Sequence, residues 1–298
     1  MDSPRDVVLF VLLSVVWGSG FVVVKVGQSY FPTVLYAALC FDVTAIGLFA
    51  YVVLRRDEWR PTTRQGWFAV GAISLFTVTI YNAFFFIGQR EAPTAVGAII
   101  LSFIPLMTAL LARLLVPDRR FAAVEVVGLL VGLVGVGFIV QPTPEAIATG
   151  DVSRLLILTA AASNALGGVL VQRFDPPAST PVLLAWAIPP GGVALHLVSL
   201  VVIGESYVDL SVTVPGVLAV VYLALLVNVM GYMIFFTLLR RVGAFEVSLV
   251  NYLQPIVAAI AGWLVLKEGL DPVSVVGFVV IVVGFALVKR DQVRALVQ

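Results

Sequence analysis

The feature that most limits how this chain folds is a series of long apolar runs. The first, residues 7–24, contains no charged side chain over 18 residues. A helix needs about 20 mainly apolar residues to cross a bilayer, and continuous runs without strand-like alternation select helices over a β-barrel. Charged residues make up 12% of the chain, against roughly 25% in a soluble domain. The sequence therefore predicts an all-α integral membrane protein.

Runs of this kind recur along the whole chain and predict ten transmembrane helices joined by short loops. Their approximate bounds are 7–27, 31–54, 65–88, 93–116, 121–140, 152–173, 180–203, 213–239, 244–266 and 271–288. Arg5 precedes the first run as a basic residue would in a secretion signal, but no small-residue cleavage site closes the run. The first run is therefore predicted to stay in the protein as a membrane span.

The second half of the chain resembles the first at a distance of about 150 residues. Phe235, Phe236, Arg240, Pro255, Ala259, Leu264 and Glu268 fall on Phe85, Phe86, Arg90, Pro105, Ala109, Leu114 and Asp118, and after one loop residue is dropped Val273, Gly277, Val283 and Gly284 fall on Val124, Gly128, Val134 and Gly135. This predicts two five-helix repeats, 7–140 and 152–288, joined by a linker at 141–151 that is rich in proline and small polar residues. Because five is odd, the two repeats must be inverted relative to each other. Inverted repeats are typical of secondary transporters, whose binding site lies near the membrane midplane.

Lysine and arginine are distributed unevenly over the predicted loops. With the amino terminus inside, 14 of the 18 fall on the inner side, and four, Lys25, Arg90, Arg154 and Lys267, fall on the outer side. Positively charged loops stay in the cytoplasm. We therefore predict a multi-pass protein of the cell membrane with both termini cytoplasmic.

Two prolines inside the fourth and ninth spans, Pro105 and Pro255, are predicted to kink their helices, because each removes a helical hydrogen bond. Polar residues share a face with them: Ser102 in one span, Asn251 and Tyr252 in the other. Polar groups are costly in hydrocarbon and often mark functional sites there, so these residues are candidates to line a cavity. The small residues on the same faces are explained as well by close helix packing.

The third and eighth spans combine aromatic rings and amides on one stripe, which would suit a zwitterionic or aromatic small molecule. The candidates for substrate binding there are Tyr81, Asn82, Asn228 and Tyr232. Trp17 in the first span lies too deep for an interfacial belt, which favours a place on the same pathway. The alternative for the phenylalanines of these stripes is core packing or lipid contact.

Asp42 lies near the middle of the second span, where an unpaired carboxylate would cost several kcal/mol. It must be protonated, paired or facing water. It is a candidate for proton coupling or for binding a cation, and the alternative is a structural hydrogen bond to a neighbouring helix. The only histidine, His196, is predicted to make one hydrogen bond between helices.

Several classes of function are excluded by composition. One histidine and one cysteine, Cys40, provide no metal-ligand set, no Cys/His nucleophile pair and no internal disulfide. A net charge of +1 argues against binding nucleic acid, and no glycine-rich nucleotide loop is present. We expect no cofactor, no metal and no enzymatic activity, with the lipid bilayer and a small-molecule substrate as partners.

At these motifs the chain resembles the drug/metabolite transporter superfamily, in its EamA branch. The resemblance rests on WGSGFVVVK at 17–25, the turn and helix from 92 to 118, the glycines from 128 to 135, and LVLKEGLDPVSVVGFVVIVVG at 264–284. It implies a basket of ten helices in two inverted repeats around a central cavity, and export of amino acids, related metabolites or small drugs. The chain departs from the family pattern at Cys40 and Asp42, where relatives often have an arginine after AAL, and at Pro117 and Asp118, where Gly and Glu are usual.

The resulting prediction is a secondary transporter that exports small metabolites such as amino acids, including aromatic or small polar compounds, by alternating access. One alternative is an exporter of cationic drugs or toxic compounds, which would be favoured if Asp42 faced the cavity. The other is a membrane receptor or subunit that transports nothing, which would have a filled interior. The sequence leaves the oligomeric state undetermined.

Overall fold

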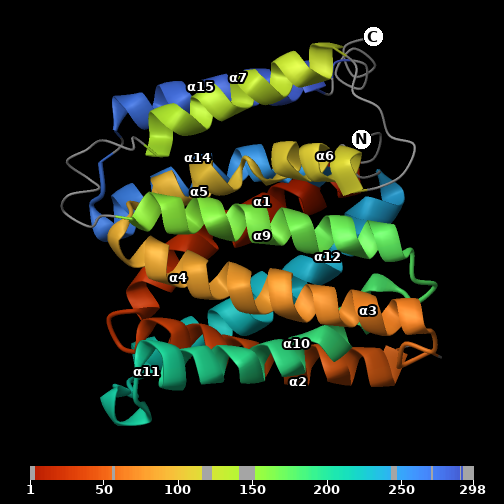
Figure 1. Ribbon diagram of the computed structural model, residues 1–298. Helices are drawn as coiled ribbons and strands as arrows, with labels where there is room; N and C mark the ends of the chain where they lie inside the picture. Colours follow the sequence, from red (N-terminus) through yellow and green to blue (C-terminus); the bar gives the residue numbers. More distant parts are fainter. Residues whose placement is uncertain are drawn as a thin grey trace.

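The computed structural model describes residues 4–55, 58–115, 123–140, 152–242, 247–269, 271–288 and 290, and in these residues every regular element is a helix (Figure 1). The first-half elements are α1 (Pro4–Gly27), α2 (Thr33–Arg55), α3 (Arg64–Ala72), η1 (Ile73–Ile80), α4 (Tyr81–Glu91), α5 (Thr94–Leu101), α6 (Ile104–Leu115) and α7 (Ala123–Val140). The second-half elements are α9 (Ser153–Phe174), α10 (Thr180–Leu197), η2 (Val198–Ile203), η3 (Tyr207–Asp209), α11 (Val214–Val221), η4 (Tyr222–Met230), α12 (Gly231–Arg241), α14 (Val250–Ala261), η5 (Gly262–Leu266) and α15 (Pro272–Val288). The predicted all-helical membrane architecture is confirmed for these residues.

Consecutive elements join into longer helical runs. Seven runs in the described chain are long and apolar enough to cross a membrane: Pro4–Gly27, Thr33–Leu54, Arg64–Glu91, Thr94–Leu115, Ser153–Phe174, Thr180–Ile203 and Val214–Leu239. Three shorter apolar helices, Val124–Val140, Val250–Leu266 and Pro272–Val288, lie where the fifth, ninth and tenth spans are predicted. The described ends fall close to the predicted bounds, whereas residues 116, 121–122 and 244–246 and the whole linker 141–151 lie outside the described residues.

Two of the long runs widen into π-helix at their middle. These segments are η1, between α3 and α4, and η4, between α11 and α12. They occupy equivalent positions, since a shift of 150 residues moves 73–80 onto 223–230. A π-helical turn bonds i to i+5, is rare, and is frequent at functional sites. The two segments therefore mark the middle of these runs as a candidate functional region.

The run that contains Pro105 is broken just before the proline. α5 ends at Leu101, Ser102 and Phe103 form a turn, and α6 begins at Ile104. Pro255 lies inside the continuous helix α14, and the turn in its run falls six residues earlier, at Leu249. Each proline thus lies in a run that is interrupted near it, on its amino-terminal side.

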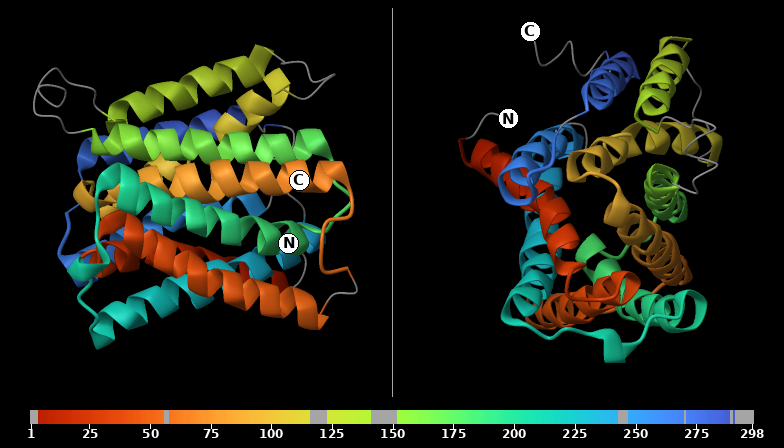
Figure 2. Two further views of the ribbon diagram at one scale, coloured as in Figure 1. Left: turned by 60° about the horizontal axis from the view of Figure 1, so that its bottom comes forward. Right: turned by 90° about the vertical axis from the view of Figure 1, so that its left-hand side faces the viewer.

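α7 and α15 pack mainly on each other, side by side at one edge of the bundle (Figures 1 and 2). Their backbones meet at glycines: a Cβ added to Gly128 would lie 2.7 Å from the carbonyl oxygen of Gly284, and one added to Gly135 would lie 2.8 Å from that of Gly277. An early residue of one helix thus contacts a late residue of the other, so the two helices are antiparallel. Small residues let helix backbones approach this closely in membranes.

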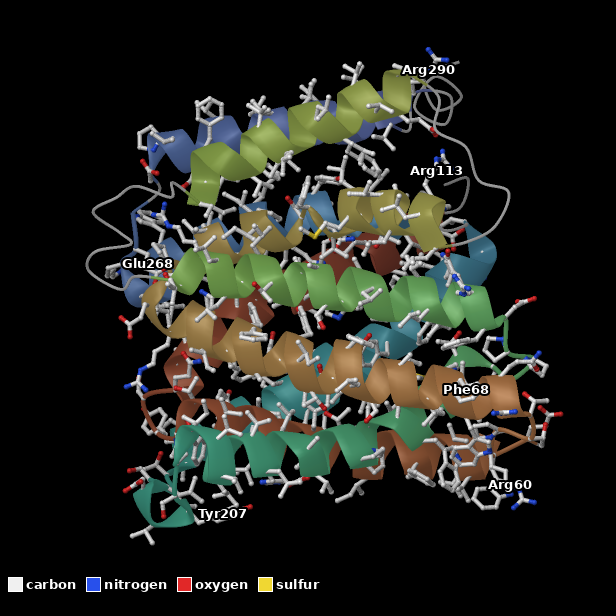
Figure 3. All side chains as sticks on the ribbon, viewed as in Figure 1. Arg60, Phe68, Arg113, Tyr207, Glu268 and Arg290 are labelled. Atoms are coloured by element: carbon white, nitrogen blue, oxygen red, sulfur yellow. The ribbon has the colours of Figure 1, made fainter. Side chains whose placement is uncertain are left out.

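Charged side chains gather at the two ends of the bundle. Figure 3 shows Arg60, Arg113 and Arg290 at one end, and Tyr207 and Glu268 at the opposite end. At the arginine end, Asp6 in the first turn of α1 accepts a hydrogen bond of 2.6 Å from Nε of Arg241 at the end of α12. The three labelled arginines and the Asp6–Arg241 pair thus lie at the end of the bundle opposite Glu268.

Candidate functional site

A cavity of about 190 Å³ lies between the helices near the middle of the long runs. It is bounded by side chains from α1, α2, η1, α4, α5, α6, α9, η4, α12 and α14, and therefore from both halves of the chain. Its lining residues are Trp17, Gly20, Phe21, Val24, Cys40, Phe41, Thr77, Tyr81, Asn82, Phe85, Phe86, Leu101, Ile104, Asn164, Leu223, Val227, Asn228, Tyr232, Asn251 and Gln254. Aromatic rings and neutral amides dominate this set, and none of its members carries a charge.

The aromatic side of the cavity is organised by Trp17. Its indole Nε1 donates a 3.0 Å hydrogen bond to the carbonyl of Val227, and its ring meets the edge of Tyr232 at 6.5 Å between centroids. A Cβ added to Gly231 would lie 2.4 Å from the indole nitrogen. The glycine therefore makes room for the indole, and the Val227 bond fixes the orientation of the ring.

Tyr81 and Phe85, one helical turn apart on α4, stack with their planes only 2° apart and centroids 5.7 Å apart. Phe21 of α1 meets Phe85 edge-on at 5.6 Å. Rings in such contact hold one another in place. The cavity therefore has a rigid aromatic wall that joins α1 and α4.

The amides of Asn82 and Asn228 are oriented by neighbouring protein groups. Asn82, at the junction of η1 and α4, donates from Nδ2 to the carbonyls of Thr77 at 3.2 Å and Val78 at 2.7 Å. Asn228 donates from Nδ2 to Oγ1 of Thr44 at 3.0 Å. The Thr44 hydroxyl is itself the donor to the carbonyl of Cys40 at 2.7 Å, so its oxygen can only accept from Asn228.

The amides on the other two walls are held less tightly. On α14, Asn251 donates to the carbonyl of Ser248 at 3.1 Å, and Gln254 reaches Oδ1 of Asn251 at 3.5 Å. Asn164 of α9 lines the cavity without an intramolecular hydrogen bond among the described residues, so its amide can turn either face to a bound molecule.

The structure brings together six of the eight predicted binding residues in the cavity lining: Trp17, Tyr81, Asn82, Asn228, Tyr232 and Asn251. The other two, Ser102 and Tyr252, are not part of it. The hydroxyl of Ser102 turns back to the carbonyl of Ile99 at 2.6 Å. Tyr252 packs on Phe285 at 4.7 Å between centroids, and its buried hydroxyl has no partner in the described part of the chain.

Three polar lining residues were missed by sequence reasoning: Thr77, Asn164 and Gln254. A signal was available for each. Thr77 lies one turn before Tyr81, and Gln254 lies three residues after Asn251, so both continue predicted stripes. Asn164 is an amide inside an apolar span, which by itself marks a candidate site.

Asp42 does not line the cavity. Its side chain is 49% exposed on α2, and its Oδ2 lies 2.8 Å from Nε2 of His196 on α10. Nδ1 of His196 lies 2.8 Å from the hydroxyl of Tyr207 in η3. The hydrogen bond predicted for His196 between helices is confirmed, and it supplies the partner of Asp42 that the sequence left open.

Glu268, in the loop after η5, joins three segments at the end of the bundle opposite the arginines (Figure 3). Its Oε1 lies 2.7 Å from Nζ of Lys25 at the end of α1, and its Oε2 accepts from the backbone N–H of Thr94 at 2.7 Å. Lys25 also donates to the carbonyl of Ala92 at 2.9 Å. Burial acts to raise the pKa of Glu268, but the hydrogen bonds from Lys25 and Thr94 outweigh burial and hold the pKa below its ordinary value.

Within the described residues, no group of three or more His, Cys, Asp or Glu side chains is arranged to hold a metal ion. Cys40, the only cysteine, is buried with a free thiol on the cavity wall. The chemistry available to the cavity is therefore hydrogen bonding from amides and hydroxyls, and contact with aromatic faces.

The sequence and the fold of the chain are similar to those of known membrane transporters and to a solved structure. The chain is 27% identical to "Uncharacterized inner membrane transporter YedA" of Escherichia coli (strain K12), over 93% of this chain and 88% of that protein. It is 25% identical to "Probable amino-acid metabolite efflux pump" of Salmonella typhimurium (strain LT2), over 95% of this chain and 94% of that protein. A solved crystal structure matches the fold with a TM-score of 0.64 over 99% of both chains, at 18% sequence identity.

The model of the EamA-like transporter family matches the chain twice, at residues 5–141 and 153–290. These two matches together cover nearly the whole sequence, and the relatives are named as transporters rather than enzymes. The chain is therefore a multi-pass membrane protein that belongs to the EamA-like transporter family.

Proposed function

We propose that the protein is a secondary transporter that exports small neutral or zwitterionic metabolites, such as amino acids, through the central cavity. The observation that carries the proposal is the cavity itself, which is lined from both halves by aromatic rings and oriented amides. A receptor or packing subunit would have no need of a chamber lined with aromatic rings and amides at this depth. The name of the Salmonella relative, a probable amino-acid metabolite efflux pump, agrees with this substrate class.

The size and charge of the cavity favour metabolites over cationic drugs. Its volume of about 190 Å³ is below the roughly 300–1,000 Å³ of sites that hold drug-sized molecules. None of the lining residues is charged, and Asp42 is paired with His196 away from the cavity. A net cation would have no counter-charge in this chamber, whereas a zwitterion carries its own.

The mechanism that we propose is alternating access between two inverted halves, residues 7–140 and 152–288, with ten spans. The glycine contacts support it: under the repeat, Gly128 corresponds to Gly277 and Gly135 to Gly284, so the two contacts between α7 and α15 are copies of each other. Equivalent residues exchanged across a contact are the mark of a two-fold axis. The matching positions of η1 and η4 support the same relation.

We further propose that both termini are cytoplasmic. With this orientation the inner loops hold 14 of the 18 lysines and arginines. Arg60, Arg113 and Arg290 gather at one end of the bundle, which would then be the inner face (Figure 3).

Transport in proteoliposomes tests the proposal. Vesicles that contain the purified protein and an unlabelled amino acid inside should take up the labelled amino acid from outside by exchange. Vesicles without the protein should not. Asn251→Ala and Tyr232→Ala should each lower the rate, because both side chains line the cavity. Unchanged rates in both variants would show that the substrate takes another path.

A proton-coupling role for Asp42 would act through His196 and Tyr207 at the outer end, and not through the cavity. Asp42→Asn removes the carboxylate and keeps the size of the side chain. If the variant keeps the wild-type rate and the wild-type dependence on pH, Asp42 is structural.

A further inference from the structure

The hydrogen bonds around the cavity orient the amide groups that line it, and so determine which of their atoms face the cavity. Asn82 is 6% exposed, and its Nδ2 is engaged by two backbone carbonyls, of Thr77 and Val78. Both carbonyls belong to η1, where the helix changes from π to α. The amide therefore cannot flip without placing its oxygen against two other oxygens, and Oδ1 points away from η1.

The same holds on the opposite half of the protein. Because the Thr44 hydroxyl donates its hydrogen bond to the carbonyl of Cys40, Asn228 must present Nδ2 to Thr44 and turn Oδ1 away. Gln254, 7% exposed, is held less tightly, by a single 3.5 Å contact from its Nε2 to Oδ1 of Asn251. Each of the three amides thus directs its nitrogen to a protein acceptor and leaves its oxygen without a hydrogen-bond donor from the described residues.

These oxygens face open space. In the described chain, four side-chain polar atoms are fully buried and have no hydrogen-bond partner. They belong to Gln28, Gln89, Thr94 and Tyr252, and none of these residues lines the cavity. The remaining oxygens of Asn82, Asn228 and Gln254 have no donor from the described protein, so the space that they reach is the cavity. They come from three helical elements, α4, η4 and α14.

We propose that these three amide oxygens, with the rings of Trp17 and Tyr232, form a subsite for the protonated amino group of the substrate. An ammonium group offers three N–H donors and no acceptor, which matches three acceptors on the walls of one cavity. Aromatic faces add attraction for a cation that has lost water. A carboxylate at this place would meet oxygens of the same sign. This inference rests on the proposed transport of small metabolites, and it names the end of the molecule that the site recognises.

Blocking one end of a ligand at a time tests the subsite. Purified full-length protein in detergent would be titrated by thermal shift with leucine, phenylalanine and threonine, each also as its N-acetyl derivative and as its carboxamide. N-acetylation removes the charge and two of the three donors, so we expect at least about a tenfold loss of affinity. The carboxamides keep the ammonium group but are net cations, for which the cavity has no counter-charge, so they should bind more weakly than the free amino acids and more tightly than the N-acetyl derivatives.

Two variants at one position assign the effect to the oxygens. Gln254→Met keeps the volume and removes the amide, at the cost of one 3.5 Å contact. It should weaken the free amines by about tenfold and leave the N-acetyl compounds unchanged. Gln254→Glu adds a counter-charge and should strengthen the carboxamides. Thr159→Ala, whose hydroxyl bonds within α9 on the exposed side, is the control and should change nothing.

The outcomes separate this inference from the proposed function. N-acetyl compounds that bind as tightly as their parents would overturn the amine subsite and leave the transporter proposal standing. Failure of all nine compounds to bind would overturn the proposed substrate class, and the subsite with it. Binding of the amines and carboxamides alone, weakened by Gln254→Met or strengthened by Gln254→Glu, would support the subsite.

Discussion

Two glycines of one helix provide a direct test of the packing between α7 and α15. A Cβ added to Gly135 would lie 2.8 Å from the carbonyl oxygen of Gly277 and 2.9 Å from the backbone nitrogen of Ile281, whereas one added to Gly137 would meet nothing within 4 Å. Because two of the three nearest atoms to this Cβ are backbone, and the third is Cγ1 of Ile281, the whole facing helix must withdraw by roughly 0.6 Å to reach the 3.4 Å of an ordinary contact. Overpacking of this kind costs about 1–3 kcal/mol.

Gly135→Ala and Gly137→Ala should therefore differ in stability in a defined direction. Alanine improves helix propensity by about 1 kcal/mol at either position, so the difference between the two variants isolates the packing term of about 1–3 kcal/mol. A loss of 1 kcal/mol lowers the melting temperature by about 2–4 °C in chains of 150–250 residues. We expect Gly135→Ala to melt at least about 2 °C below Gly137→Ala, measured by circular dichroism in detergent. Equal melting temperatures, or a higher value for Gly135→Ala, would refute the close glycine contact.

Three further predictions concern side chains around the cavity and at the Glu268 end of the bundle. Gly231→Ala should displace Trp17, whose indole nitrogen lies 2.4 Å from the new Cβ, and should lower the transport rate in proteoliposomes; a wild-type rate would show that the indole position is unimportant. Tyr252→Phe removes a buried hydroxyl that has no partner in the described chain, so its melting temperature should equal or exceed that of the wild type, and a clear loss would reveal a partner. Glu268→Gln should lower stability by about 1–2 kcal/mol at pH 7, because a charged acceptor of the Lys25 and Thr94 N–H groups is lost. Since the pKa of Glu268 is held below its ordinary 4.5, the carboxylate contributes above that value and loses its contribution as pH falls through the lowered pKa. Melting curves of the two proteins should therefore converge in acid, and a gap that widens there would contradict the assignment.

The sequence predicted the cavity well wherever depth and helical spacing carried the signal. Trp17 was identified because it lies too deep for the membrane interface, and Asn228 and Tyr232 because they share a stripe. Tyr252 was misplaced because it follows Asn251 directly and so lies about 100° further round the helix, where it meets Phe285. Ser102 lies in the turn before Pro105, where its hydroxyl bonds back to its own chain.

Other features depend on contacts that no local pattern encodes. The partner of Asp42 is 154 residues away on α10, and only the folded arrangement brings the two together. The π-helical segments η1 and η4 are mainly apolar, as are the α-helices around them, so hydropathy does not distinguish them. The orientation of the amides likewise follows from the hydrogen-bond network and not from residue type.

The most direct test of a cavity that opens to water uses the one cysteine already in the chain. Cys40 is 1% exposed and lies on the cavity wall, so a thiol reagent reaches it only when the cavity opens. In membranes that contain the wild-type protein, a small methanethiosulfonate reagent that cannot cross lipid should modify Cys40, and a transported amino acid should slow that modification. Modification by a lipid-permeant reagent alone, at the same rate with and without the amino acid, would contradict a water-filled transport site at the centre of the bundle.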